Sequence, residues 1–506
     1  MKNVNPSISV LTIIICLVFA NSNIQAQKYD NKWMMGYQYA PSTPFPALDF
    51  MFGNPDTIGF YGLFPFFGTN TSICNAQGLL QFYSNGVFIS NKFDAPLANA
   101  DSFNIDDITT YSVSHPFDQS AITLPQPGSN HEYLIFHIGG KYIQPQYIPQ
   151  ELRMSKIDMN LQGGAGEMTI KKQVILSDDL TYMSLNAVKH GNGRDWWVVI
   201  GEFNSSNFYS VLVTPNGIDT IITSGNLAPV NREPLRGESS FSPDGNLFAL
   251  TATSLGQTIG DNDLMLYNFD RCSGHFTFRD SLSYPSIADS SFLGCAFSPN
   301  SRFLYITTPH DLHQFDLTVA SLIAGRKQIA TYNASIDPYP LFFNKMQLGP
   351  DNKIYMVSYN GSRYLNVINN PDQSDTICNF VQNQLRLVSY HSGSIPTFPH
   401  FRLGAATGSG CDTLSTGIQE SLQQPGELKG HYLNGNIYLE IPEATSSTGS
   451  LEVRNADGRL IRKELVPPQT GQWPYTLQNI YPSDGLYVLS LISGGKRWIC
   501  KLMVIR

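Results

Sequence analysis

The stretch Glu238-Ser-Ser-Phe-Ser-Pro-Asp-Gly-Asn-Leu-Phe-Ala-Leu250 decides the fold, because the chain repeats its pattern. The pattern returns as Cys295-Ala-Phe-Ser-Pro-Asn-Ser-Arg-Phe-Leu-Tyr-Ile306 and as Met346-Gln-Leu-Gly-Pro-Asp-Asn-Lys-Ile-Tyr-Met-Val357. Proline presets φ for a turn, and Asp or Asn tolerates the tight conformation that follows. Each copy therefore predicts a strand, a turn and a second strand. A third strand such as Asp263–Phe269 and a fourth such as Phe276–Leu282 follow it.

Weaker copies of the same unit lie upstream. The expected first strands centre near Ile73, Ile122, Ala187, Phe241, Phe297 and Leu348. Their spacing runs from about 49 residues, between the first two centres, to about 65, between the second and third. Four strands in roughly 50 residues is the period of a β-propeller blade. The repeat therefore predicts an all-β chain whose main domain is a propeller with six complete blades.

A seventh blade can be assembled from both ends of the repeat region. Pro399–Leu403 has the pattern of an innermost strand with no strands after it. Trp33–Tyr37, Ala47–Met51 and Thr57–Tyr61 have the pattern of three outer strands with no inner strand before them. Joining them would close the ring and remove an unpaired sheet edge. We expect seven blades over residues 27–404, with six or eight as the alternatives.

The N-terminus has the features of a secretory signal peptide over residues 1–26. Lys2 supplies a positive charge, and Ile8–Ala20 is apolar apart from Ser9 and Thr12. That run is too short for a hydrocarbon core, which needs about 20 residues. We place cleavage after Ala26; a buried N-terminal strand is the alternative. No other segment has the length and apolarity of a transmembrane span, which predicts a secreted or surface-held protein.

The last 80 or so residues predict a separate small β-sandwich. Leu451–Arg454 alternates apolar and polar residues, as a half-buried strand does. Asp457, Gly458 and Arg459 then form a turn, Gly485–Leu491 is an expected strand, and a final strand contains Lys501. Residues 405–424 are rich in Gly, Ser, Thr and Gln and are expected to be a linker. The sandwich is therefore placed at residues 425–506.

This order of motifs resembles the C-terminal sorting domain of the type IX secretion system of the Bacteroidetes. The features that carry the resemblance are Asp457-Gly458-Arg459, then Gly485 and Tyr487, a Gly-rich turn, and Lys501 in the terminal strand. The resemblance implies recognition by the type IX secretion machinery and export across the outer membrane. Release or surface attachment would follow. The alternative is an ordinary immunoglobulin-like module of the mature protein.

The repeat region is similar to secreted Bacteroidetes propellers of the YVTN/WD-repeat type that carry such sorting domains. The residues that carry this similarity are Trp33 with Gly36, Gly78–Gly86, Lys189–Val199, Asn268–Gly274, Phe297–Tyr305 and Ile395–Gly404. The similarity spans nearly the whole chain and implies fold and export. It implies no activity that can be transferred residue by residue. The Trp-Asp dipeptide of eukaryotic WD repeats is absent.

Composition narrows the classes of function. Charged residues make up 14% of the chain, against roughly 25% in a typical domain, and aromatic residues make up 12%. With 41 Gly and 31 Pro, this favours short strands and tight turns over long helices. The net charge of −8 argues against a nucleic-acid partner held through phosphates.

Six cysteines remain after removal of Cys16 with the signal peptide, and export permits disulfides. We expect a Cys272–Cys295 bridge between neighbouring blades and a Cys378–Cys411 bridge at the ring closure. Cys74 and Cys500 lie on apolar strands and are expected to be buried thiols. No Cys or His spacing fits a zinc site, so no metal ligand is assigned.

Several further motifs favour structural roles over chemistry. Gly163–Gly166 precedes a predicted strand rather than a helix, so we expect a hairpin loop and not a phosphate site. His310 and His313 are expected at the surface, and Gly260–Asp263 in a solvated loop. Trp196-Trp197 could line a sugar-binding face but is more typical of the layers between blades.

The sequence assigns no catalytic residue and no cofactor, because the serine-hydrolase elbow and the zinc-protease helix are both missing. The leading hypothesis is a non-catalytic propeller that binds a protein or glycan at one face or at the channel mouth. The alternative is a propeller glycoside hydrolase or polysaccharide lyase with Asp/Glu groups around the channel, which distant positions could supply. A structural component of the surface layer or gliding machinery is the third possibility.

Overall fold

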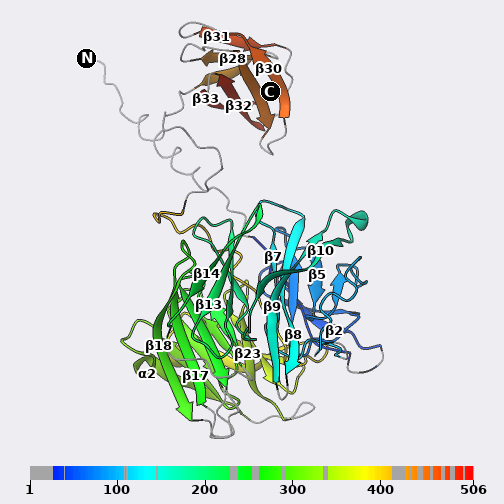
Figure 1. Ribbon diagram of the computed structural model, residues 1–506, viewed down its shortest axis with the longest axis vertical. Coiled ribbons are helices and arrows are strands. Elements are labelled where there is room, and N and C mark those ends of the chain that lie inside the picture. Colours follow the sequence, from blue (N-terminus) through cyan, green and yellow to red (C-terminus); the bar gives the residue numbers. More distant parts are fainter. Residues whose placement is uncertain are drawn as a thin grey trace, which may run out of the picture. The chain divides into compact units, whose positions relative to one another are not determined.

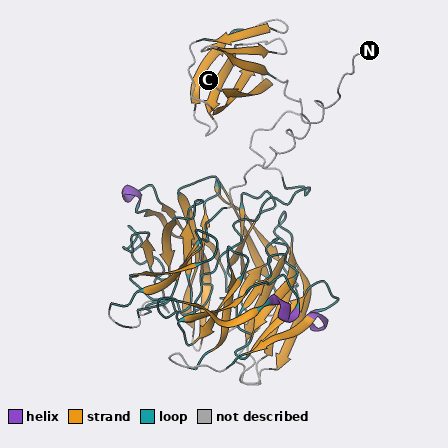
Figure 2. Ribbon diagram, turned by 180° about the vertical axis from the view of Figure 1, so that it is seen from behind, coloured by secondary structure: helices purple, strands orange, loops and turns teal. Residues whose placement is uncertain are grey.

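The computed structural model describes residues 27–38, 40, 42–107, 109, 112–143, 146–227, 237–253, 261–285, 292–333, 340–412, 428–433, 436–441, 448–455, 460–468, 473–478, 485–493 and 496–504. The chain divides into two compact units, Met1–Leu414 and Ser415–Arg506. The expected signal peptide, residues 1–26, lies outside the described residues, as do Asp457, Gly458 and Arg459 of the sorting motif. Strands are the main regular secondary structure of both units (Figure 2).

In the first unit, seven antiparallel sheets follow one another along the described residues, each built from consecutive strands (Figure 1). Their strands are β1 (Lys32–Met34), β2 (Phe45–Asp49), β3 (Asp56–Phe60); β4 (Thr71–Cys74), β5 (Leu80–Ser84), β6 (Ile89–Asn91); β7 (Ala121–Pro125), β8 (Glu132–Ile143), β9 (Gln146–Asp158), β10 (Glu167–Ser177); β11 (Asn186–Lys189), β12 (Trp196–Gly201), β13 (Phe208–Thr214), β14 (Gly217–Ser224); β15 (Ser239–Phe241), β16 (Leu247–Thr253), β17 (Asp261–Phe269), β18 (Phe276–Pro285); β19 (Cys295–Phe297), β20 (Phe303–Thr307), β21 (Asp311–Asp316), β22 (Arg326–Thr331); β23 (Phe342–Leu348), β24 (Ile354–Tyr359), β25 (Tyr364–Ile368) and β26 (Phe380–Arg386). The short helical turns are η2 (Gln162–Gly164), α2 (Leu322–Gly325) and η3 (Asp375–Cys378).

The repeated turns form as the sequence predicts. Ser239 pairs with Leu250 and Cys295 with Ile306, so the residues between them make tight hairpins. Gly245 has φ +74°, a conformation that glycine adopts without strain, at the end of the Pro-Asp-Gly turn. The fold of this unit is therefore all-β and propeller-like.

The sheets pack face to face in a closed circuit. On β12, Trp196 belongs to the core shared with the preceding sheets, and Trp197 to the core shared with the following sheet. The tryptophan pair is thus packing between sheets, as expected. Further cores join the β15–β18 sheet to β19–β22, and β19–β22 to β23–β26. The circuit closes where the Tyr355 ring of β24 lies 5.6 Å from Trp33 of β1.

The segment that ends the first unit corrects one prediction. Pro399–Leu403 is not a strand of the β1–β2–β3 sheet. Two prolines, Pro396 and Pro399, lack the N–H groups that a strand pairing needs. The chain here nevertheless lies near the N-terminal sheet: the ring of Phe398, just before the segment, is 5.8 Å from Trp33 of β1. Arg402 forms a bidentate ion pair, at 2.6 and 2.7 Å, with Asp30, which precedes β1.

The strand pattern also places two other groups differently from expectation. His313 is buried on β21, not at the surface, because the faces of a strand between two packed sheets are both covered. Asp261–Asp263 belongs to strand β17 rather than to a solvated loop. Gly163 and Gly164 lie in η2 between β9 and β10, so the hairpin-loop prediction is confirmed.

The second unit consists of two antiparallel sheets around one core. The sheets are β27 (Lys429–Leu433), β28 (Asn436–Ile441) and β31 (Trp473–Leu477); and β30 (Leu460–Val466), β29 (Gly449–Asn455), β32 (Gly485–Ser493) and β33 (Lys496–Val504). Leu439 and Leu489, from different sheets, share the core with Trp498. Gly485 begins β32, Tyr487 is buried on it, and Lys501 lies in β33. None of the helices among the described residues is long and apolar enough to span a membrane.

Candidate ligand-binding site

A cavity of about 480 Å³ lies where the sheets of the first unit converge. We call it the funnel; it is lined by Tyr37, Phe67, Pro116, Phe117, Asp118, Met183, Gly237, Leu293, Asn344, Lys345, Tyr359, Asn360, Ser392 and Gly393. Most of these residues directly precede the first strand of a sheet, or lie on it. The repeat therefore brings one short segment of each sheet to the same opening, although the segments are far apart in sequence.

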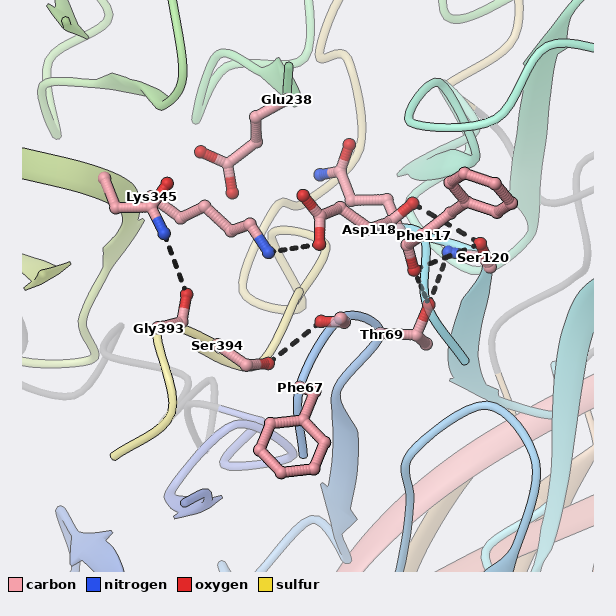
Figure 3. A network of polar contacts seen from close by, with 12 residues as sticks. Phe67, Thr69, Phe117, Asp118, Ser120, Glu238, Lys345, Gly393 and Ser394 are labelled. Atoms are coloured by element: carbon pink, nitrogen blue, oxygen red, sulfur yellow. Dashed lines mark hydrogen bonds and ion pairs between the residues drawn. The ribbon is translucent and has the colours of Figure 1, made fainter. Parts of the chain in front are cut away.

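An ion pair forms the floor of the funnel. Lys345 Nζ contacts Asp118 Oδ1, and the two side chains are only 9% and 20% exposed (Figure 3). Lys345 comes from β23, and Asp118 precedes β7 on another sheet. Because the pair is shielded from water, its attraction is stronger than that of a surface pair. It offers a fixed donor next to a fixed acceptor.

Glu238, immediately before β15, lies beside this pair. Its side chain is directed toward Lys345 and Asp118 (Figure 3), and the residue is only 5% exposed. Its Oε2 accepts hydrogen bonds from the backbone N–H groups of Cys295, at 3.0 Å, and Met346, at 3.3 Å. Burial raises the pKa of the Glu238 carboxyl to about 8, although these N–H groups and Lys345 oppose the shift. Glu238 is therefore mostly protonated at neutral pH.

Hydrogen bonds hold the funnel wall in place. Thr69 Oγ1 donates to the Phe117 carbonyl at 2.7 Å and accepts from the Ser120 N–H at 2.9 Å (Figure 3). Asn344 Nδ2 donates to the Gly393 carbonyl at 3.1 Å, and Ser394 Oγ to the Gly68 carbonyl at 2.9 Å. The wall thus joins segments of several sheets, and the opening is pre-formed.

Aromatic rings surround the opening. Phe67 is 48% exposed and Tyr359 40% exposed. The ring of Tyr37 lies 6.0 Å from that of Phe67, and Phe117 stacks on Tyr182 at 4.2 Å. The funnel therefore combines an apolar, aromatic rim with a polar floor, which is the usual make-up of a small-molecule site.

The opposite end of the same channel is closed by the chain itself. Thr397–His400 crosses beneath Glu238, and the space left there is about 10 Å³, room for about one water molecule. His400 Nε2 contacts the Phe241 carbonyl at 2.8 Å. Arg271 then donates to the Gly404 carbonyl. Between the described residues, this end of the channel therefore leaves no passage for a ligand.

The disulfide at this closed end differs from both predicted pairings. Cys272 is bonded to Cys411, with 5.6 Å between their Cα atoms, whereas Cys295 and Cys378 are buried free thiols. The two predicted bridges were wrong because the chain after Leu403 crosses to the β17–β18 turn instead of ending in a strand. Cys74 and Cys500 are buried thiols, as expected. The bridge fastens the end of the crossing segment.

Sequence reasoning missed Asp118, Glu238 and Lys345, which form no local motif. One signal could have found them: each is a charged residue just ahead of a predicted first strand or at its start, where residues face the channel. No group of three or more His, Cys, Asp or Glu side chains within the described ranges could hold a metal. The arrangement can bind a ligand by stacking and hydrogen bonding.

No protein-family model and no curated protein matches the sequence. Among solved structures, a Lactobacillus plantarum protein matches with a TM-score of 0.42 and 13% identity, over 71% of this chain and 98% of its own. PorZ, a surface component of the type IX secretion system of Porphyromonas gingivalis, matches with a TM-score of 0.27 and 9% identity, over 92% and 73%. The extracellular domain of a putative hybrid two-component system from B. thetaiotaomicron matches with a TM-score of 0.36 and 12% identity, over 94% and 55%. Similarities this low say nothing about ligand or activity.

Proposed function

We propose that the first unit is a seven-bladed β-propeller and that the second is an immunoglobulin-like sandwich. The closed circuit of packed sheets supports the propeller, because a linear array would leave the β1–β3 and β23–β26 sheets without the contact between Trp33 and Tyr355. The two sheets around a single core support the sandwich.

We infer that the protein is a non-catalytic binding module, secreted or held at the cell surface, whose ligand enters the funnel. The observation that carries this proposal is the pre-formed, one-sided funnel with the Asp118–Lys345 pair fixed at its floor. Propellers present such openings because all blades contribute to the channel mouth. Asp118 and Lys345 are paired with each other at this floor. An ion-paired carboxylate is better suited to hydrogen-bonding a ligand than to acting as a nucleophile or base toward it.

One observation favours a second candidate, a propeller glycoside hydrolase or lyase. Glu238, with its raised pKa, lies close enough to Asp118 for the Asp118 charge to contribute to that shift. A protonated acid near an ionised carboxylate is the pair that glycoside hydrolysis uses. Against it, Glu238 is not part of the funnel lining, and Lys345 is paired with the Asp118 carboxylate.

Incubation of the purified full chain with a polysaccharide panel separates the two candidates. The binding module retains one or more polymers in affinity electrophoresis and releases neither reducing ends nor unsaturated products. Phe67→Ala removes an exposed ring of the rim and weakens that retention. Phe93→Ala removes a 65% exposed ring outside the funnel and is the matched control. Turnover that Glu238→Gln abolishes would establish the enzyme instead.

We further propose that the type IX secretion machinery exports the chain through residues 425–506, after the signal peptide is removed. Gly485 begins β32 and Tyr487 is buried on it, which supports the predicted strand of this motif; the turn at Asp457 is outside the described residues. A chain truncated after residue 424 is expected to accumulate in the periplasm of a type IX-competent host. Its appearance in the medium at the level of the full chain would reject this role.

A further inference from the structure

We propose that the funnel binds the end of an uncharged saccharide chain. The inference rests on the proposed function, since it names the ligand of the same site. It follows from three properties of the described funnel: its balance of charge, the chemistry of its rim and floor, and its closed end.

The balance of charge argues for a neutral ligand. Of the lining residues that the structure describes, Asp118 and Lys345 are the two that carry charge, and they are paired with each other. A ligand anion or cation would leave water without gaining a free counter-charge, and an uncompensated buried charge is strongly unfavourable. A neutral ligand carries no such penalty.

The rim and floor offer the two kinds of contact that a sugar ring needs. The partly exposed rings of Phe67 and Tyr359 at the rim can contact the apolar C–H face of a sugar ring. At the floor, the Lys345 ammonium group donates and the Asp118 carboxylate accepts, within one ion pair. A hydroxyl group both donates and accepts, so neighbouring ring hydroxyls can engage both members of the pair without separating them. An aliphatic ligand would leave the remaining hydrogen-bonding capacity of this pair unused.

The closed end argues for a chain terminus. Because Thr397–His400 leaves about 10 Å³ below Glu238, a polymer cannot thread through the channel. The funnel's volume of about 480 Å³ is at the lower part of the roughly 300–1,000 Å³ range of small-ligand sites. It accepts a short stretch of a chain and excludes a folded protein domain. The structure thus favours recognition of an end over recognition of the middle of a polysaccharide.

The test measures binding of the purified full chain, by calorimetry, to neutral hexasaccharides of glucose, mannose, xylose and N-acetylglucosamine. Hexagalacturonate is the charged comparison, and cyclic glucans are the comparison without ends. We expect at least one neutral linear hexasaccharide to bind, and the cyclic and acidic compounds to bind at least tenfold more weakly. Phe67→Ala and Tyr359→Ala should each weaken the binding about tenfold, and Phe93→Ala less than twofold. Thermal unfolding of each variant verifies that it is folded.

Three results would overturn the saccharide inference: tighter binding of the acidic oligomer, equal binding of a cyclic glucan, or no binding by any neutral saccharide. The proposed function fails separately. If a peptide or protein from the cell surface binds and Phe67→Ala weakens that binding, the funnel remains a binding site and only the ligand class is wrong. If Phe67→Ala and Tyr359→Ala leave every observed interaction unchanged, the funnel is not the site and both proposals fail.

Discussion

Replacing Glu238 with glutamine should make the stability of the first unit less dependent on pH. The carboxyl is buried beside Lys345 and Asp118, and its pKa is raised to about 8, mainly by loss of hydration. A group whose pKa is higher in the folded state stabilises that state most when both states are protonated. The contribution is complete below the unfolded pKa, near 4.5, and is lost as the pH rises to about 8. Glutamine cannot ionise, so it removes this loss.

The size of the effect follows from the difference between the two pKa values. Each pH unit between them changes stability by about 1.4 kcal/mol. At pH 7, about 2.5 units above the unfolded pKa, the ionisable side chain lowers the free energy of unfolding by roughly 3 kcal/mol relative to pH 4.5. Glutamine also adds an N–H₂ group whose burial without a partner would cost about 1–3 kcal/mol, but that term does not change with pH. The slope, not the absolute stability, is therefore the decisive quantity.

Urea unfolding at pH 5, 6, 7 and 8 measures this slope. Trp33, Trp196 and Trp197 are three of the five tryptophans and are buried in the first unit, so its unfolding contributes to the change in fluorescence. The stability of Glu238→Gln minus that of the parent chain should rise by about 1.4 kcal/mol per pH unit between pH 5 and pH 7, and by less between pH 7 and pH 8, where native Glu238 begins to ionise. Asp56→Asn, which alters an exposed acid at the start of β3, should give a nearly flat difference. A flat difference for Glu238→Gln would refute the reasoning and mean that Glu238 is ionised in the native protein.

Other predictions concern the closed end of the channel. Denatured, unreduced protein lacking residues 1–26 should contain four titratable thiols, and reduction should raise the count to six. Replacing both Cys272 and Cys411 with serine should lower the free energy of unfolding by about 3–5 kcal/mol, because the bridge closes a loop with a sequence separation of 139. A loss below about 1 kcal/mol would mean that the chain around Cys411 detaches before the first unit unfolds. Arg402→Ala leaves the buried Asp30 carboxylate without its bidentate partner and should cost about 3 kcal/mol in urea unfolding. Arg302→Ala, which breaks an exposed pair with Asp316, should cost far less; equal losses would contradict this account.

The fold could be predicted because its signal is local. A Pro-Asp-Gly turn between apolar strands dictates a hairpin within about a dozen residues, and repetition of that hairpin at a blade-like spacing indicates radial packing. The burial of strand residues was harder to predict from the sequence. His313 follows the alternation of a surface strand, yet packed sheets cover both faces of β21. Pattern alone does not reveal how many faces of a strand are covered.

The site could not be predicted, because nothing in the sequence links its members. Asp118, Glu238 and Lys345 are separated by more than 100 residues and meet only after the circuit of sheets has closed. The prediction of the disulfide pairing failed for a related reason. Its pairing depends on the path of the chain after Pro399, where a strand was expected and a crossing segment occurs. Long-range geometry, not residue type, determines both features.

The same geometry decides whether Glu238 could serve as an acid catalyst. A general acid must reach the atom that it protonates, within hydrogen-bond distance. Glu238 Oε2 instead accepts from the amides of Cys295 and Met346, and the funnel lining includes its neighbour Gly237 but not Glu238 itself. Protonation of Glu238 therefore lowers the free-energy cost of burying its carboxyl group. With Glu238 neutral, the charges of Asp118 and Lys345 balance, and the floor stays suited to an uncharged ligand.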